Sequence, residues 1–189
     1  MVTQPTPPAI RFETPHYIVR TLEDADATAD WGRWLSDPAT AHNLNARPEA
    51  RSREQILAYI NSFDRATAHL LGIFEKDTNR LIGIRALYIH PTRSEFLVNV
   101  LVGEAGARNK GARAETSAAM YRYFFEELGF EAACCTVLAT NDAILRVMDR
   151  NGWVRERTDR KPAATGQGIV EIHTFRLTRD AWRKKQHGA

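Results

Sequence analysis

The sequence predicts one mixed α/β (α+β) domain, with a central, mostly antiparallel sheet of about seven strands and helices on both faces. Apolar segments at 69–75, 80–89 and 95–102 are separated by short polar turns, which is typical of antiparallel strands. Their apolar residues fall on both faces, so helices should cover the sheet on both sides. A long helical pattern at 112–128 then leads to a later strand, as a crossover helix does.

The elements before these strands are a strand and two helices. Residues 17–22 alternate between apolar and polar and indicate the first strand. Asp24 can cap a helix that Pro38 should end. A capping box at 52–55 begins a second helix, whose apolar face holds Ile56, Tyr59, Ile60 and Phe63.

The elements after the three strands alternate between helix and strand. The helix at 112–128 ends before Gly129, which suits the position after a helix. A strand at 131–140, a helix at 141–151 and strands at 153–157 and 169–177 follow. The Pro- and Gly-containing segment 158–168 is expected to be a loop. We predict a single domain over 10–189, preceded by a disordered Pro- and Thr-rich lead at 1–9 that is not a signal peptide.

Composition disfavours several functional classes. The net charge is only +3 and both signs are interspersed, so a nucleic-acid surface is not favoured. No apolar run approaches the roughly 20 residues that cross a membrane. Cys134 and Cys135 are adjacent in an apolar run without other metal-ligand spacing, which favours buried thiols and no metal site. We therefore expect a cytoplasmic protein.

The strand–loop–helix at 98–116 contains the most informative motif. Such a junction directs backbone N–H groups and a helix dipole at one point, which suits a phosphate. The loop resembles motif A of the GNAT acetyltransferases, Arg/Gln-x-x-Gly-x-Gly/Ala, at Arg108, Asn109, Lys110 and Gly111. The resemblance implies that acetyl-CoA binds with its pyrophosphate on these residues and Ala112. The sixth position is Arg113, which could add a cation near the phosphates, point into solvent or block the site.

A second segment resembles motif B of the same family, from Asn141 to Gly152 and Trp153. The family fold implies that two central strands splay apart and hold the pantetheine arm of the cofactor. By resemblance, Val100, Leu101 and Val102 would line that arm, and Asn141 would hydrogen-bond it. An N–H near Leu101 or Val102 would polarise the thioester carbonyl.

The sequence leaves the identity of the acceptor amine open. The end of the chain, 171–182, resembles enzymes that acetylate N-termini of ribosomal proteins, whereas 100–104 resembles polyamine and amino-sugar acetyltransferases. The expected acceptor is therefore a small-molecule or peptide amine. A homodimer is suggested only by analogy with relatives. A CoA-binding module without catalysis is the alternative function.

The sequence also leaves open which side chains transfer protons. The usual donors of the family, a Tyr or a Ser in motif B, are replaced by Met148 and Ile144. Glu104 and His173 are the candidates for the general acid or base. The alternative is that Glu104 is a solvated loop acid and that His173 is a hydrogen-bonded histidine on the sheet. Glu171 shares a strand face with His173 and could contact substrate. Arg85 lies mid-strand and could bind an anionic substrate group or pair with a carboxylate.

Overall fold

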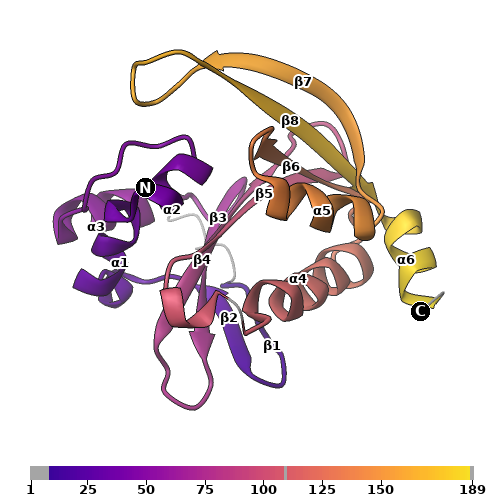
Figure 1. Cartoon of the computed structure of the whole chain (residues 1–189). Coiled ribbons are helices and arrows are strands. Elements are labelled where there is room, and N and C mark those ends of the chain that lie inside the picture. Colours follow the sequence, from indigo (N-terminus) through magenta and orange to yellow (C-terminus); the bar gives the residue numbers. More distant parts are fainter. Residues whose placement is uncertain (1–8, 109, 188–189) are drawn as a thin grey trace, which may run out of the picture.

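The computed structural model describes residues 9–108 and 110–187, and residues 1–8 of the expected lead lie outside them. An eight-stranded sheet with the order β1-β2-β3-β4-β5-β6-β8-β7 forms the centre (Figure 1). All neighbouring strands are antiparallel except β5 and β6, so the predicted fold class is confirmed. The strands are β1 (Arg11–Glu13), β2 (Tyr17–Thr21), β3 (Ala68–Glu75), β4 (Leu81–Ile89), β5 (Glu95–Val102), β6 (Ala132–Leu138), β7 (Val154–Pro162) and β8 (Ile169–Thr178).

Helices cover the two faces of this sheet unequally. On one face, α1 (Ala29–Arg33) and α3 (Arg53–Asn61) pack on β2–β4, and α2 (Pro38–Asn43) lies beside them (Figure 1). On the other face, α4 (Ala112–Arg122) and α5 (Asp142–Arg150) cover the strands, and α6 (Arg179–His187) follows β8. Each layer encloses its own apolar cluster, because alternate strand residues point to opposite faces.

Several predicted elements differ from the observed ones. The helix expected from Asp24 is broken into a 3₁₀ turn (Asp24–Asp26), α1 and a second 3₁₀ turn (Trp34–Ser36). Pro38 does not end a helix; it opens α2, whose N-cap is Asp37, because the first turn needs no proline N–H. The predicted helix at 112–128 changes to a π-helix at Tyr123–Glu127.

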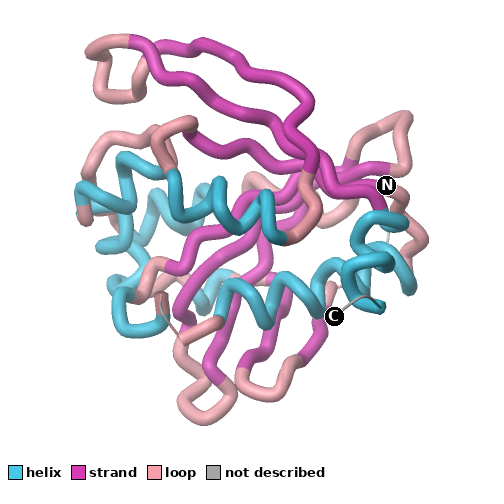
Figure 2. Tube along the Cα trace, turned by 45° about the vertical axis from the view of Figure 1, so that its right-hand side comes forward, coloured by secondary structure: helices cyan, strands magenta, loops and turns pink. Residues whose placement is uncertain are grey.

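The segment 158–168 is only partly a loop. Strand β7 continues to Pro162, so β7 and β8 form a long hairpin (Figure 2). Its tip reaches the loop after α2, where the Arg47 Nε donates to the Ala164 carbonyl at 2.9 Å. The Ala164 N–H donates in turn to the Asn45 side-chain oxygen at 2.9 Å. We call this pair of contacts the hairpin latch.

The two halves of the sheet meet at a short parallel joint. Strand β5 pairs with β4 over seven residues, but with β6 over only three, ending at Leu97 and Cys134. Beyond that point β5 and β6 separate, while β6 stays paired with β8 on its other edge over the whole of Ala132–Leu138. Residues 98–102 and 135–138 therefore face a gap that contains no strand pairing. This splay confirms the expected divergence of the central strands.

Candidate functional site

The β5–α4 connection forms one end of the splay. Its beginning is fixed by the N–H groups of Gly103 and Glu104, which both donate to the Ile82 carbonyl at 3.0 and 3.1 Å. Its end is Gly111, the N-cap of α4, with a left-handed φ of 79°. Glycine adopts this conformation without steric cost, so the chain turns sharply into the helix.

The N-terminus of α4 differs from those of other helices. At the N-termini of α1, α2, α3 and α5, backbone N–H groups donate to the side chains of the capping residues Thr28, Asp37, Ser52 and Asn141. Gly111 has no side chain, and no side-chain cap for α4 occurs in the described part of the chain. The first-turn N–H groups of α4 are therefore oriented for an anion, which the helix dipole also favours.

Arg108 ties this loop to the opposite helical layer. Its guanidinium donates to the Gly103 carbonyl at 2.9 Å, the Thr40 hydroxyl at 2.8 Å and the Asp37 carboxylate at 3.1 Å. Hydrogen bonds from Thr40 and Arg108 hold the pKa of Asp37 below its usual value. The first residue of the motif thus shapes the loop through its side chain. Of its neighbours, Lys110 is exposed, Ala112 is buried, and Asn109 lies outside the described residues.

Arg113 turns inward on the α4 face of the sheet. It is half-buried, and burial lowers the pKa of its guanidinium. Burial lowers the pKa of Arg85 on β4, and the Arg113 charge adds to that lowering, whereas burial raises the pKa of the Cys135 thiol on β6 and the Arg113 charge opposes part of that rise. The Arg113 side chain is therefore partly enclosed rather than fully in solvent.

Arg85 is enclosed between β4 and α4, with 1% of its surface exposed. It donates to the Arg113 carbonyl at 3.2 Å and to the hydroxyls of Thr116 at 2.6 Å and Ser117 at 2.9 Å. No carboxylate within the described ranges forms an ion pair with it, and burial lowers its pKa to about 10. Arg85 supports the first turns of α4, and its guanidinium is not open to a substrate.

The two strands and Asn141 line the remainder of the splay. Val100 and Val102 pack toward α4, whereas Leu101 packs toward the α1–α3 layer. Asn141 follows β6 and caps α5, with its side-chain oxygen accepting from the Ile144 N–H at 3.3 Å. Its amide NH₂ has no partner among the described residues, so it remains available to a bound arm.

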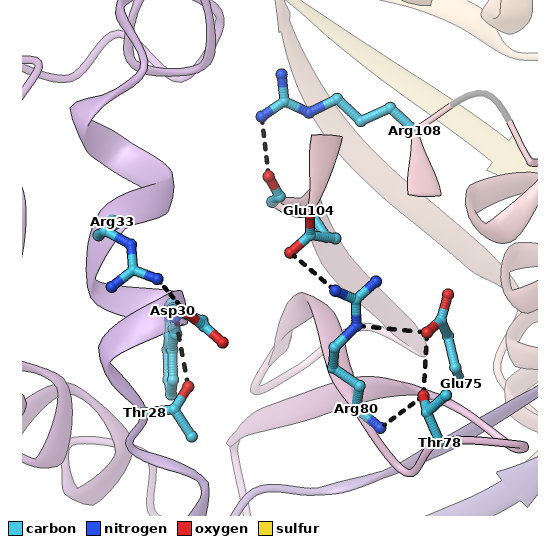
Figure 3. A network of polar contacts seen from close by, with 10 residues as sticks. Thr28, Asp30, Arg33, Glu75, Thr78, Arg80, Glu104 and Arg108 are labelled. Atoms are coloured by element: carbon cyan, nitrogen blue, oxygen red, sulfur yellow. Dashed lines mark hydrogen bonds and ion pairs between the residues drawn. The ribbon is translucent and has the colours of Figure 1, made fainter. Parts of the chain in front are cut away.

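Glu104 lines a cavity of about 380 Å³ between the β5–α4 loop and the α1 side. Figure 3 shows the Asp30–Arg33 pair on α1 facing Glu104, whose carboxylate lies 3.7 Å from the Arg80 guanidinium. The full lining is Asp30, Arg33, Trp34, Asp37, Gly103, Glu104, Ala105 and Arg108. We call this the charged pocket. It borders the loop on the face away from α4 and α5.

His173 and Glu171 lie elsewhere, on β8, with β6 between them and β5. The His173 Nδ1 is 2.8 Å from the Thr158 hydroxyl, and its Nε2 is 3.5 Å from the Arg155 guanidinium. Glu171 is exposed and lies 3.8 Å from Arg160. The structure therefore separates this pair from Glu104. Met148 is buried against Cys135, and Ile144 is half-buried, so neither supplies a proton.

Sequence patterns did not identify the helical wall of the charged pocket. Asp30, Trp34 and Asp37 come from two short helices and a turn whose relation to the loop at 103–108 depends on tertiary packing. Gly103 carries the one available signal. A Cβ atom there would lie 1.9 Å from the Trp34 ring, so the glycine permits this close approach.

Comparisons with known proteins agree with this architecture. Residues 16–154 match the acetyltransferase (GNAT) domain model. No curated protein sequence matches the chain. Three solved structures illustrate the shared fold. A GNAT-family acetyltransferase from Bacillus anthracis has 17% identity, a TM-score of 0.74, and coverage of 90% of this chain and 99% of its own.

Two further structures are of enzymes named for their acceptors. The spermidine N-acetyltransferase of Vibrio cholerae, in complex with CoA and spermine, has 13% identity, a TM-score of 0.75 and coverage of 88% and 98%. The ribosomal-protein-S5-alanine acetyltransferase of Vibrio fischeri has 16% identity, a TM-score of 0.71 and coverage of 92% and 98%. At these identities the likeness is one of fold. The family model, however, covers most of the chain, and the protein belongs to the GNAT acetyltransferase family.

Proposed function

We propose that the protein is a cytoplasmic N-acetyltransferase that transfers the acetyl group of acetyl-CoA directly to a primary amine. The observation that carries the proposal is the coincidence of two features at one place. From Val98 onward the edge of β5 that faces β6 has no strand partner, and the uncapped first turn of α4 follows the end of β5. A pantetheine arm requires the first feature, and a pyrophosphate suits the second.

The reaction needs a neutral amine and an electrophilic carbonyl. The amine nitrogen attacks the thioester carbon, the carbon–sulfur bond breaks, and the products are an amide and the CoA thiol, with the amine's proton balancing the thiolate. An N–H of Leu101 or Val102 would stabilise the negative charge that develops on the carbonyl oxygen. Glu104, beside the charged pocket, is placed to orient an ammonium or relay its proton.

We propose that the acetyl group is accepted by a polyamine, an amino sugar or a protein N-terminus. Two of the structurally similar proteins are a spermidine N-acetyltransferase and a ribosomal-protein-S5-alanine acetyltransferase. The charged pocket is lined by three carboxylates, Asp30, Asp37 and Glu104, each of which lies within 4 Å of an arginine, so a cationic acceptor would have to share them with those arginines. In the described ranges no helix is long and apolar enough to span a bilayer.

Cofactor binding is tested on the purified protein by native mass spectrometry and by titration calorimetry with CoA. We expect a bound CoA mass and saturable binding, with Arg113→Ala changing the affinity. Binding by Arg113→Ala but not by the wild type would identify Arg113 as a plug and contradict the proposal. Absence of binding in both would also overturn it.

Transfer is tested next with acetyl-CoA and an amine panel of spermidine, glucosamine and an alanine-initiated peptide. We expect amine-dependent release of the CoA thiol, detected with a thiol reagent. The replacement of both usual proton donors by Met148 and Ile144 favours a second candidate, a CoA-binding module without catalysis. CoA binding without amine-dependent thiol release would select that candidate.

A further inference from the structure

The strand register determines which side chains flank the splay on the face away from α4. On β5, Phe96 and Val98 belong to the cluster beneath α4 and α5, so Leu97, Asn99 and Leu101 point to the opposite face. On β6, Cys135 and Val137 belong to that same cluster, so Cys134, Thr136 and Leu138 point away from it. Both sets therefore project on the α1–α3 side of the sheet.

Asn99 and Thr136 are exposed polar residues in these two sets. Each lies two residues beyond Leu97 and Cys134, the last pair between β5 and β6, where the facing edges of the two strands no longer pair with each other. Neither side chain has a hydrogen-bond partner anywhere in the described residues. The two strands thus present one carboxamide and one hydroxyl on the two edges of the splay.

The helical layer does not cover this position. Helices α1 and α3 bury Ile84 and Ala86 of β4, but the Asn99 side chain, opposite Ala86 on the neighbouring strand, is exposed. The nearby acid on the same face, Glu95, is engaged by Arg176, with contacts of 2.6 and 3.2 Å to one carboxylate oxygen. Arg176 also lies 3.8 Å from Glu156 of β7. The groups at the splay edges themselves are uncharged.

We propose that the Asn99 side-chain carbonyl and the Thr136 hydroxyl bind the reacting amine of the acceptor, which approaches the splay from the face opposite α4. This assignment rests on the proposed function and specifies the part of the chain that holds the nucleophile. The side-chain oxygens of Asn99 and Thr136 carry no charge, so they can accept hydrogen bonds from an amine and orient it without favouring its protonated form. A carboxylate at the same place would hold the ammonium, which cannot attack the thioester.

The test compares Asn99→Ala and Asn99→Asp with wild type in steady-state kinetics, with saturating acetyl-CoA and the best amine of the panel. Asn99→Ala should raise the KM for the amine at least about fivefold. Asn99→Asp should lower that KM but lower kcat about tenfold or more, and move the pH profile of kcat upward by about one unit. A purely structural role of Asn99 would not produce this combination of changes in the KM for the amine, kcat and the pH profile.

Two further variants complete the test. Thr136→Val removes the hydroxyl at similar volume, and we expect a KM increase of about threefold. Thr92→Asp adds the same charge in the exposed turn before β5, away from the splay, and should leave KM, kcat and the pH profile unchanged. In all four variants the calorimetric Kd for CoA should stay within twofold of wild type, because none of the substituted side chains points to the face that α4 covers.

The outcomes distinguish the two proposals. Wild-type transfer with unchanged KM, kcat and pH profile in both Asn99 variants would overturn the role of Asn99 and leave the acetyltransferase proposal intact. Equal losses in kcat and CoA affinity would also overturn it, since they would indicate a role in folding or cofactor binding. Wild-type protein that binds CoA but transfers to no amine would overturn the proposed function, and this inference with it.

Discussion

The two joints at either edge of β5 differ in a way that relates the fold to its function. Strand β5 is joined to β4 by seven antiparallel pairs, with helices covering both faces of β4. Its other edge is joined to β6 by three parallel pairs, and polar side chains are exposed beyond them. A complete ladder satisfies its own backbone groups, whereas a splayed one leaves them for a ligand. The incomplete joint is therefore the part of the sheet to which the proposed cofactor arm would bind.

The contact between Gly103 and Trp34 should be the most sensitive point at the end of the complete joint. Gly103→Ala places a Cβ atom 1.9 Å from the Trp34 ring, and we expect the free energy of unfolding to fall by about 1–3 kcal/mol. Urea denaturation measures this change. Gly106→Ala is the matched control, because a Cβ there meets nothing within 4 Å. Equal effects of the two substitutions would contradict a close-packed junction at Gly103.

Arg108 should have the next largest effect, because it connects the end of β5 to α2. Arg108→Gln loses the contacts to Asp37, Thr40 and the Gly103 carbonyl, which should lower the free energy of unfolding by about 1–2 kcal/mol. The CoA affinity should fall as well. Both are measured at neutral pH, by urea denaturation and by calorimetry.

Acidification provides a check on the Arg108 contact with Asp37. The pKa of Asp37 is lowered in the folded protein, so its stabilising contribution is present above the ordinary carboxyl pKa of about 4 and is lost as the pH falls. The difference in stability between wild type and Arg108→Gln should therefore shrink at pH 3. A difference that stayed constant with pH would argue against the ionic contact.

The hairpin latch should have the smallest effect, since it joins exposed segments on the side of the incomplete joint. Asn45→Ala removes the acceptor of the Ala164 N–H, and Arg47→Ala removes the donor to its carbonyl. We expect each to lower global stability by less than about 1 kcal/mol, but to speed proteolysis at the tip, 163–168. Unchanged cleavage rates would indicate that the tip does not depend on the latch.

Sequence patterns predicted the parts of the site that are continuous in the chain. The capping box at Ser52, the glycine at the start of α4 and Asn141 at the start of α5 all lie where the sequence placed them. Local chemistry sets these positions, because caps and left-handed turns depend on few neighbouring residues. The short helices between Asp24 and Asn43 were not resolved from sequence, because tertiary packing overrides weak local propensity there.

The sequence by itself determined the order of the strands from β2 to β8 and of the longer helices between them, the motif residues and the residue types at the loop, but not β1, α2 or α6. Only the tertiary structure decided that Arg85 is enclosed under α4, that Glu104 shares a pocket with α1, and that His173 stands two strands away. It also decided that Asn99 and Thr136, 37 positions apart in the chain numbering, flank one splay. The physical reason is register: pairing across strands and the packing of helices select which side chains meet, and no short sequence pattern specifies either.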